Sequence, residues 1–177
     1  MNAFKSAKSG QYAGIVYIAL SVLSLLGMLL SPYTRSLWTF LEVVAYAYTA
    51  AMLLIKRRDA LMAIGFGVLL LLSLRSLFVV YGFINIITVL LQVLAYGSMT
   101  LFALADFIPS LKDPAGKYWF IPAGCMAVCI VPLFLTGVFN WIFNGLPFFG
   151  YFVLMVLSGI IGYLISAAGL YFAAAWT

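Results

Sequence analysis

The chain has 177 residues, of which 67% are hydrophobic and only 7% are charged, and its mean hydropathy is +1.21. Soluble domains average about 45–50% apolar residues, so this composition excludes a soluble globular protein. The formal net charge of +5 comes from basic residues that lie mostly between the apolar stretches. It therefore has a topological explanation, and we expect no nucleic-acid partner.

Six apolar stretches follow one another along the chain. They cover residues 11–30, 37–55, 60–80, 84–107, 119–139 and 148–174. Each is close to the length of about 20 apolar residues that a helix needs to cross a bilayer, and none alternates with the period of two of a barrel strand. The sequence therefore predicts an all-α integral membrane protein, a six-transmembrane-helix bundle that forms a single domain over residues 1–177.

The basic residues predict the orientation of this bundle. Most of them fall on one side of the predicted spans: Lys5, Lys8, Lys56, Arg57, Arg58, Lys112 and Lys117. By the positive-inside rule, both termini are then cytoplasmic. We expect the protein in the cytoplasmic (inner) membrane of a prokaryote, with membrane lipids as partners. Asp106, near the same face, is expected to meet basic residues in the headgroup zone.

Three polar side chains are predicted to lie at similar depth in consecutive spans. Counted from the span ends on the cytoplasmic side, Glu42, Arg75 and Gln92 lie 14 or 15 residues deep. At about 1.5 Å per residue, all three fall in the outer half of the bilayer. Because consecutive helices are usually neighbours and a charge inside a span is costly, we predict a Glu42–Arg75 ion pair with Gln92 within reach.

Two tyrosines extend this cluster. Tyr46 lies one turn deeper than Glu42, and Tyr96 one turn deeper than Gln92, each on the same helix face. One interpretation is an outward-facing site for a polar or charged solute, with substrate-binding residues Glu42, Arg75, Gln92, Tyr46 and Tyr96. The other is structural: Glu42 and Arg75 neutralise each other and fix the helix packing.

A weak internal repeat accompanies the cluster. Residues 41–46 read LEVVAY, residues 91–96 read LQVLAY, and residues 154–159, LMVLSG, form a fainter third copy. Each copy lies in the second span of a successive pair. If the repeat is real, the chain consists of three helical hairpins, and Glu42, Gln92 and Met155 are equivalent.

Two further patterns concern helix packing. The last span carries small residues at helical spacing, namely Ser158, Gly162, Ser166 and Gly169. Such a face serves either packing within the bundle or docking of another subunit or a second copy, and the sequence does not separate the two. In the fifth span, Pro132 is predicted to kink the helix.

The missing residue types argue against an enzyme. The chain contains no histidine, no glycine-rich phosphate loop and no nucleophile elbow, and its two cysteines, Cys125 and Cys129, are too few for a usual zinc site. We therefore expect no catalytic residue, no metal and no cofactor.

Three functions stay open. The first is a small transporter, or the membrane substrate-binding subunit of a larger one. In helix number and chain length the sequence is similar in outline to the substrate-binding components of energy-coupling-factor importers, although its first span lacks an Ala-x-x-x-Ala docking pattern. The second is a non-catalytic structural or regulatory subunit of a membrane complex. The third is an ion or proton path through Glu42, which a neighbouring Arg75 would oppose.

Overall fold

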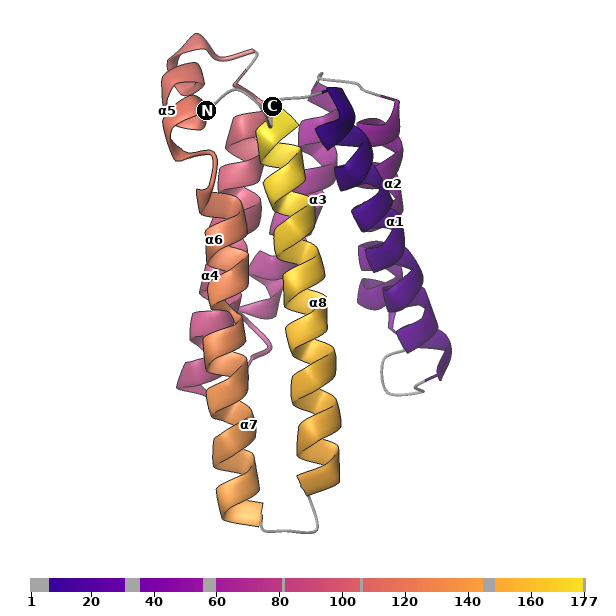
Figure 1. Ribbon diagram of the computed structural model, residues 1–177, viewed down its shortest axis with the longest axis vertical. Coiled ribbons are helices and arrows are strands. Elements are labelled where there is room, and N and C mark those ends of the chain that lie inside the picture. Colours follow the sequence, from indigo (N-terminus) through magenta and orange to yellow (C-terminus); the bar gives the residue numbers. More distant parts are fainter. Residues whose placement is uncertain are drawn as a thin grey trace.

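The computed structural model describes residues 7–30, 36–55, 60–80, 82–105, 107–144 and 149–176. Every regular element in these ranges is helical (Figure 1). The elements are α1 (Ala7–Leu30), α2 (Leu37–Leu54), α3 (Ala60–Ser76), α4 (Phe83–Ala103), the short 3₁₀ helix η2 (Pro109–Leu111), α5 (Lys112–Tyr118), α6 (Ile121–Val128), α7 (Ile130–Asn144) and α8 (Phe149–Trp176). Several residues named for the predicted topology lie outside the described ranges: Lys5, Lys56, Arg57, Arg58 and Asp106.

Five helical segments of the described chain are long and apolar enough to cross a membrane. They are Lys8–Leu30, Leu37–Leu54, Phe83–Ala103, Ile121–Phe143 and Val156–Trp176. The apolar helix α3 has only 17 residues, which is the lower limit of the usual range of about 17–25. The all-helical class is therefore confirmed, while the sixth span and the cytoplasmic side of the termini stay predictions.

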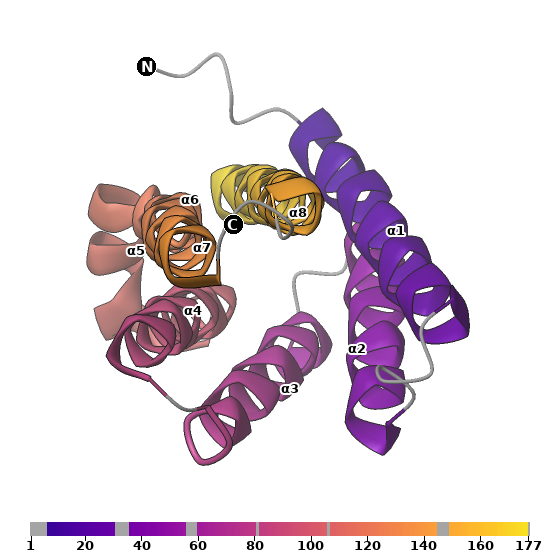
Figure 2. The same cartoon turned by 90° about the horizontal axis from the view of Figure 1, so that it is seen from below.

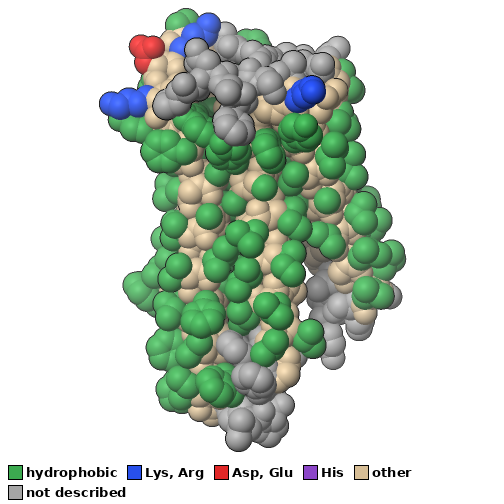
Figure 3. All heavy atoms as spheres, viewed as in Figure 1, with side chains coloured by type: hydrophobic (Ala, Val, Ile, Leu, Met, Phe, Trp, Pro, Cys, Tyr) green, Lys and Arg blue, Asp and Glu red, His purple; other side chains and the backbone are tan. Residues whose placement is uncertain are grey.

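The outer surface of the bundle is apolar along most of its length. Figure 3 shows hydrophobic side chains over nearly the whole visible side and charged ones at one end only. That end holds the start of α1, the end of α8 and the short helix α5, and we call it the terminal end (Figure 1). Monomeric soluble proteins rarely expose so large an apolar surface, whereas a bilayer covers one without cost.

The long helices form a closed ring. Contacts join α1 to α2, α2 to α3, α3 to α4, and α4 to both α6 and α7, while α8 closes the ring against α6, α7 and α1. Figure 2 shows this arrangement end-on, with α3 between α2 and α4. The three predicted hairpins are therefore pairs of neighbouring helices: α1 with α2, α3 with α4, and α6–α7 with α8.

The fifth predicted span is broken, as Pro132 predicts. Helix α6 ends at Val128, Cys129 adopts a turn conformation, and α7 begins at Ile130. A proline has no N–H to donate to the carbonyl one turn earlier, and its ring clashes with that carbonyl, which here belongs to Val128. The helix is interrupted about one turn before the proline, and the size of the kink stays a prediction.

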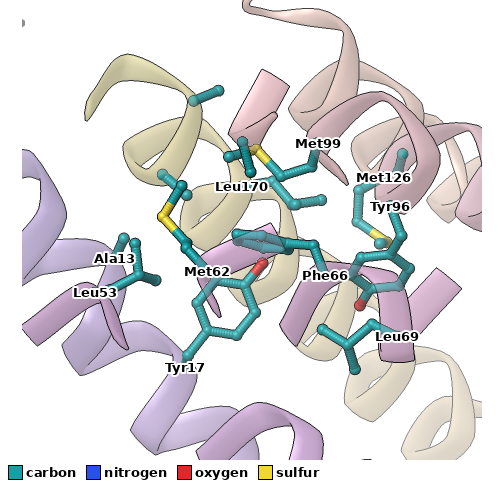
Figure 4. Close-up of a cluster of buried hydrophobic side chains, with 14 of the residues drawn as sticks. Ala13, Tyr17, Leu53, Met62, Phe66, Leu69, Tyr96, Met99, Met126 and Leu170 are labelled. Atoms are coloured by element: carbon teal, nitrogen blue, oxygen red, sulfur yellow. The ribbon is translucent and has the colours of Figure 1, made fainter. Parts of the chain in front are cut away.

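The tightly packed core occupies the half of the bundle toward the terminal end. Its largest buried side chains include Tyr17, Phe66, Met99, Met126 and Leu170, which meet from five helices (Figure 4). Along α8, most of the buried side chains fall between Ser166 and Trp176. The opposite half of the ring is packed less completely, and this is where the cavity lies.

Candidate functional site

A cavity of about 750 Å³ lies inside the ring, between α1, α2, α4, α6, α7 and α8. Its apolar wall consists of Leu20, Leu23, Met126, Leu133 and Ile161, together with two glycines of α8. Its polar lining consists of Ser24, Glu42, Tyr46, Gln92, Tyr96, Ser158, Tyr163 and Ser166. The volume is within the range of about 300–1,000 Å³ that is typical of small-molecule sites, which also combine apolar walls with a few polar groups.

Four of the five residues predicted from the sequence line this cavity. Glu42 and Tyr46 reach it from α2, and Gln92 and Tyr96 reach it from α4. On each helix the two residues are four apart, so they project from the same face at successive turns. The structure thus brings these side chains together, while their role in binding a substrate stays a prediction.

A chain of hydroxyl groups leads to the carboxyl of Glu42. The hydroxyl of Tyr46 donates a hydrogen bond of 3.1 Å to Glu42 Oε1, and it lies 3.3 Å from the hydroxyl of Tyr96. A tyrosine has a single hydroxyl proton, so Tyr46, having donated to Glu42, must accept from Tyr96. The order of donation is therefore Tyr96 to Tyr46 to Glu42, and both tyrosines are buried.

Gln92 is held from the opposite side of the cavity by a residue that the sequence did not single out. Its Nε2 donates a hydrogen bond of 3.1 Å to the hydroxyl of Tyr163 on α8. Tyr163 lies 71 residues further along the chain, and no motif joins it to Gln92. A signal was available, since Tyr163 lies one turn after Gly159 and one turn before Ser166, so a polar ring shares a helix face with small residues.

A second, smaller cavity continues the polar lining toward α3. It has a volume of about 100 Å³ and shares Glu42, Tyr46, Gln92 and Tyr96 with the larger one. Its α3 wall includes Ser73 and Ser76, whose hydroxyls donate to carbonyls one turn earlier in their own helix. The two tyrosines and their partners therefore separate two hollow regions of the interior.

The small residues of α8 make room for the cavity. Ser158, Gly162 and Ser166 line it, and a side chain built at Gly162 would meet no atom within 4 Å. Gly169, one turn beyond Ser166, instead packs against α1, where a Cβ would lie 3.0 Å from Val16. In the described part of the chain this face thus serves the cavity and the α1–α8 contact, and it is not left free as a docking face.

The predicted Glu42–Arg75 ion pair is wrong. Arg75 is not among the residues that line either cavity beside Glu42, and its guanidinium carbon lies 4.0 Å from the centre of the Trp38 ring. Helix α3 begins at Ala60, as predicted, and ends at Ser76, so Arg75 is in its last turn. There it faces Trp38, one turn farther out on α2 than Glu42, and its charge complements the helix C-terminus.

The chain matches no protein-family model, no curated protein and no solved structure.

The arrangement can hold a small molecule by polar contacts within an apolar chamber. Within the described residues, Glu42 forms no ion pair, and its Oε2 has no hydrogen-bond partner. Gln92 Oε1 is likewise without a partner among them, and so is the hydroxyl proton of Tyr163. These three residues, on three different helices, therefore offer two acceptor groups and one donor to whatever enters the cavity, in addition to the serine hydroxyls of its lining.

Proposed function

We propose that the protein is a small multi-pass membrane protein that takes a polar or charged solute into the cavity between its helices, as a transporter or as a membrane substrate-binding subunit. The observation that carries this proposal concerns the carboxyl group of Glu42. It lines a cavity of about 750 Å³ and has no ion-pair partner in the described chain. Ionisable groups inside a membrane are costly and usually mark a pathway or a site.

The polar residues assigned to this site are Glu42, Tyr46, Gln92, Tyr96 and Tyr163. Arg75 is not assigned to it, because it is held over Trp38 outside the cavity. The assignment includes no catalytic step, and the sequence without histidine supports that choice. We place the protein in the cytoplasmic membrane with both termini inside, because Lys8, Lys112 and Lys117 share the terminal end of the bundle.

Native mass spectrometry of the protein, extracted gently from its own membrane, tests this proposal. We expect a chain that carries a defined small molecule in the wild type and in Arg75→Met, and that loses it in Glu42→Gln. The glutamine keeps the size of the side chain and removes only its charge. A chain that is bare in all three forms would contradict the solute-handling role.

A non-catalytic structural or regulatory subunit of a membrane complex is the second candidate. The observation in its favour is an apolar groove of about 580 Å³ on the outer surface of α3, α4 and α6, where Gly97, Ser98 and Thr100 allow a close approach. If this role holds, the bare chain co-purifies with a fixed set of other chains, and bulky substitutions at Gly97 release them.

A further inference from the structure

The charge in the cavity lining limits the class of ligand that the cavity can bind. The described chain contains six charged residues: Lys8, Glu42, Arg75, Lys112, Asp113 and Lys117. Of these, only Glu42 lines the cavity. The nearest candidate for a counter-ion, Arg75, is engaged with Trp38 and lines neither hollow beside Glu42. Arg75 therefore does not occupy the space beside Glu42 as its counter-ion.

Two acceptor atoms of the cavity have no partner among the described residues. Tyr46 donates its hydrogen bond to Oε1 of Glu42, so Oε2 can still accept a hydrogen bond from a ligand. Gln92 uses its Nε2 on Tyr163 and so keeps its Oε1 as a second acceptor on the neighbouring side of the cavity. Two acceptors, one of them a carboxylate oxygen, match a ligand group that carries a positive charge and several N–H donors.

The aromatic lining adds a third contribution. Tyr46, Tyr96 and Tyr163 contribute their rings to the same cavity. The face of an aromatic ring attracts a cation within about 6 Å of its centre, most strongly where water is excluded. The leucine, isoleucine and methionine side chains of the wall suit the hydrocarbon part of such a ligand.

We infer that the solute is an organic ammonium ion, a primary or secondary amine with an apolar body, and that Glu42 is its counter-ion. This inference rests on the proposed function and names its substrate class. Glu42 is half-buried and faces the cavity, so an ammonium ligand supplies the positive charge that the described bundle does not provide beside it. Gln92 accepts a second N–H, and the apolar wall of α1 and α7 covers the body of the ligand.

Four probes of one shape test the inference: 2-phenylethylammonium, its N,N,N-trimethyl analogue, 2-phenylethanol and 3-phenylpropanoate. Binding is measured by equilibrium dialysis against the full chain in lipid nanodiscs, with empty nanodiscs subtracted. We expect 2-phenylethylammonium to bind about tenfold or more tightly than the alcohol, because a hydrogen bond to a charged group is worth that factor. The trimethyl analogue should fall between them, since it keeps the charge and loses the N–H donors.

The variant Glu42→Gln should remove the preference for the amine over the alcohol. Arg75→Met is the matched control and should keep the wild-type order of affinities. Preferred binding of 3-phenylpropanoate, or equal binding of amine and alcohol, would overturn the ammonium assignment while leaving a solute-binding cavity in place. If no probe binds and the purified chain also carries no small molecule, both the assignment and the proposed function fail. The wild-type comparison alone decides the matter if Glu42→Gln does not fold.

Discussion

Tyr46 and Tyr96 are 50 residues apart in the chain, yet their hydroxyl oxygens lie 3.3 Å apart in the interior of the bundle. Each is the last residue of one copy of the internal repeat. The two copies also have the same pattern of exposure: the first two residues are half-buried, the fourth is exposed, and the last two are buried. The repeat therefore presents equivalent faces of α2 and α4 to the same interior.

The third copy of the repeat does not follow this pattern. Leu154 and Ser158 are exposed, where their counterparts in the first two copies are half-buried and buried. The side chain of Met155, the predicted equivalent of Glu42, lies outside the described part of the structure. On α8 the polar residue that faces Gln92 is Tyr163, one turn beyond the end of the copy. The pairing of α2 with α4 is therefore a relation of two helices, not of three.

The order of hydrogen-bond donation predicts unequal effects of removing the two hydroxyls. Tyr46→Phe deletes the bond to Glu42 and the bond from Tyr96, so we expect a loss of about 2–3 kcal/mol in the free energy of unfolding. Tyr96→Phe deletes one neutral bond and should cost about 1 kcal/mol. Chemical or thermal unfolding in detergent measures both values.

Tyr48→Phe is the control for this comparison. Tyr48 is on the same helix as Tyr46, and no hydrogen bond involves its hydroxyl among the described residues. Its substitution should be nearly neutral. Because the two core tyrosines share one bond, the double variant should cost less than the sum of the single ones. A larger effect at Tyr96 than at Tyr46 would contradict the assigned direction of donation.

The sequence predicted the helical class, the approximate helix bounds and four of the residues that line the cavity, because all of these follow from hydropathy and helical periodicity. It did not predict how the ends of the helices align. Counting residues from the cytoplasmic span ends placed Arg75 at the depth of Glu42, whereas Arg75 contacts Trp38, one turn away on α2. Such a count gives neither the stagger between two helices nor the direction in which a side chain points. Tyr163 was missed because pairing between α4 and α8 depends on the closure of the ring, which no local pattern encodes.

Filling the cavity should abolish ligand binding without unfolding the protein. Gly162 lines the cavity, and a side chain there meets open space, so Gly162→Leu places a large apolar group where the ligand would lie. We expect the bound small molecule, or the ammonium probe, to be lost. The free energy of unfolding should not fall, since glycine disfavours a helix by about 1 kcal/mol relative to good helix formers.

Gly124→Leu is the matched control for this substitution. Gly124 on α6 also has open space around it but does not line the cavity. It should give a similar change in stability and leave binding intact. Equal binding by wild type and Gly162→Leu would exclude the cavity as the ligand site.

Tyr17 provides a test of the core. Its side chain is 1% exposed, and its ring packs edge-on against Phe66 with the ring centres 5.7 Å apart (Figure 4). Its hydroxyl has no hydrogen-bond partner among the described residues. Because an unsatisfied buried hydroxyl costs about 1–3 kcal/mol, we expect Tyr17→Phe to raise the free energy of unfolding by about 1 kcal/mol. Tyr12→Phe, at an exposed position of the same helix, should change little. A clear fall for Tyr17→Phe would show instead that a water molecule or a solute bonds to this hydroxyl.

Double-mutant cycles distinguish the observed partner of Arg75, which is Trp38, from the predicted partner, which is Glu42. A cation over an exposed aromatic ring contributes about 0.5–1 kcal/mol, so Arg75→Met and Trp38→Leu should each lower stability by about that amount. The double variant should cost little more than either single one, because both remove the same contact.

In a parallel cycle, the effects of Glu42→Gln and Arg75→Met on stability should be additive, since no ion pair joins these side chains in the described structure. A coupling energy of about 1 kcal/mol or more between Glu42 and Arg75 would show that these side chains do form an ion pair. It would also remove the uncompensated carboxylate on which the ammonium site depends.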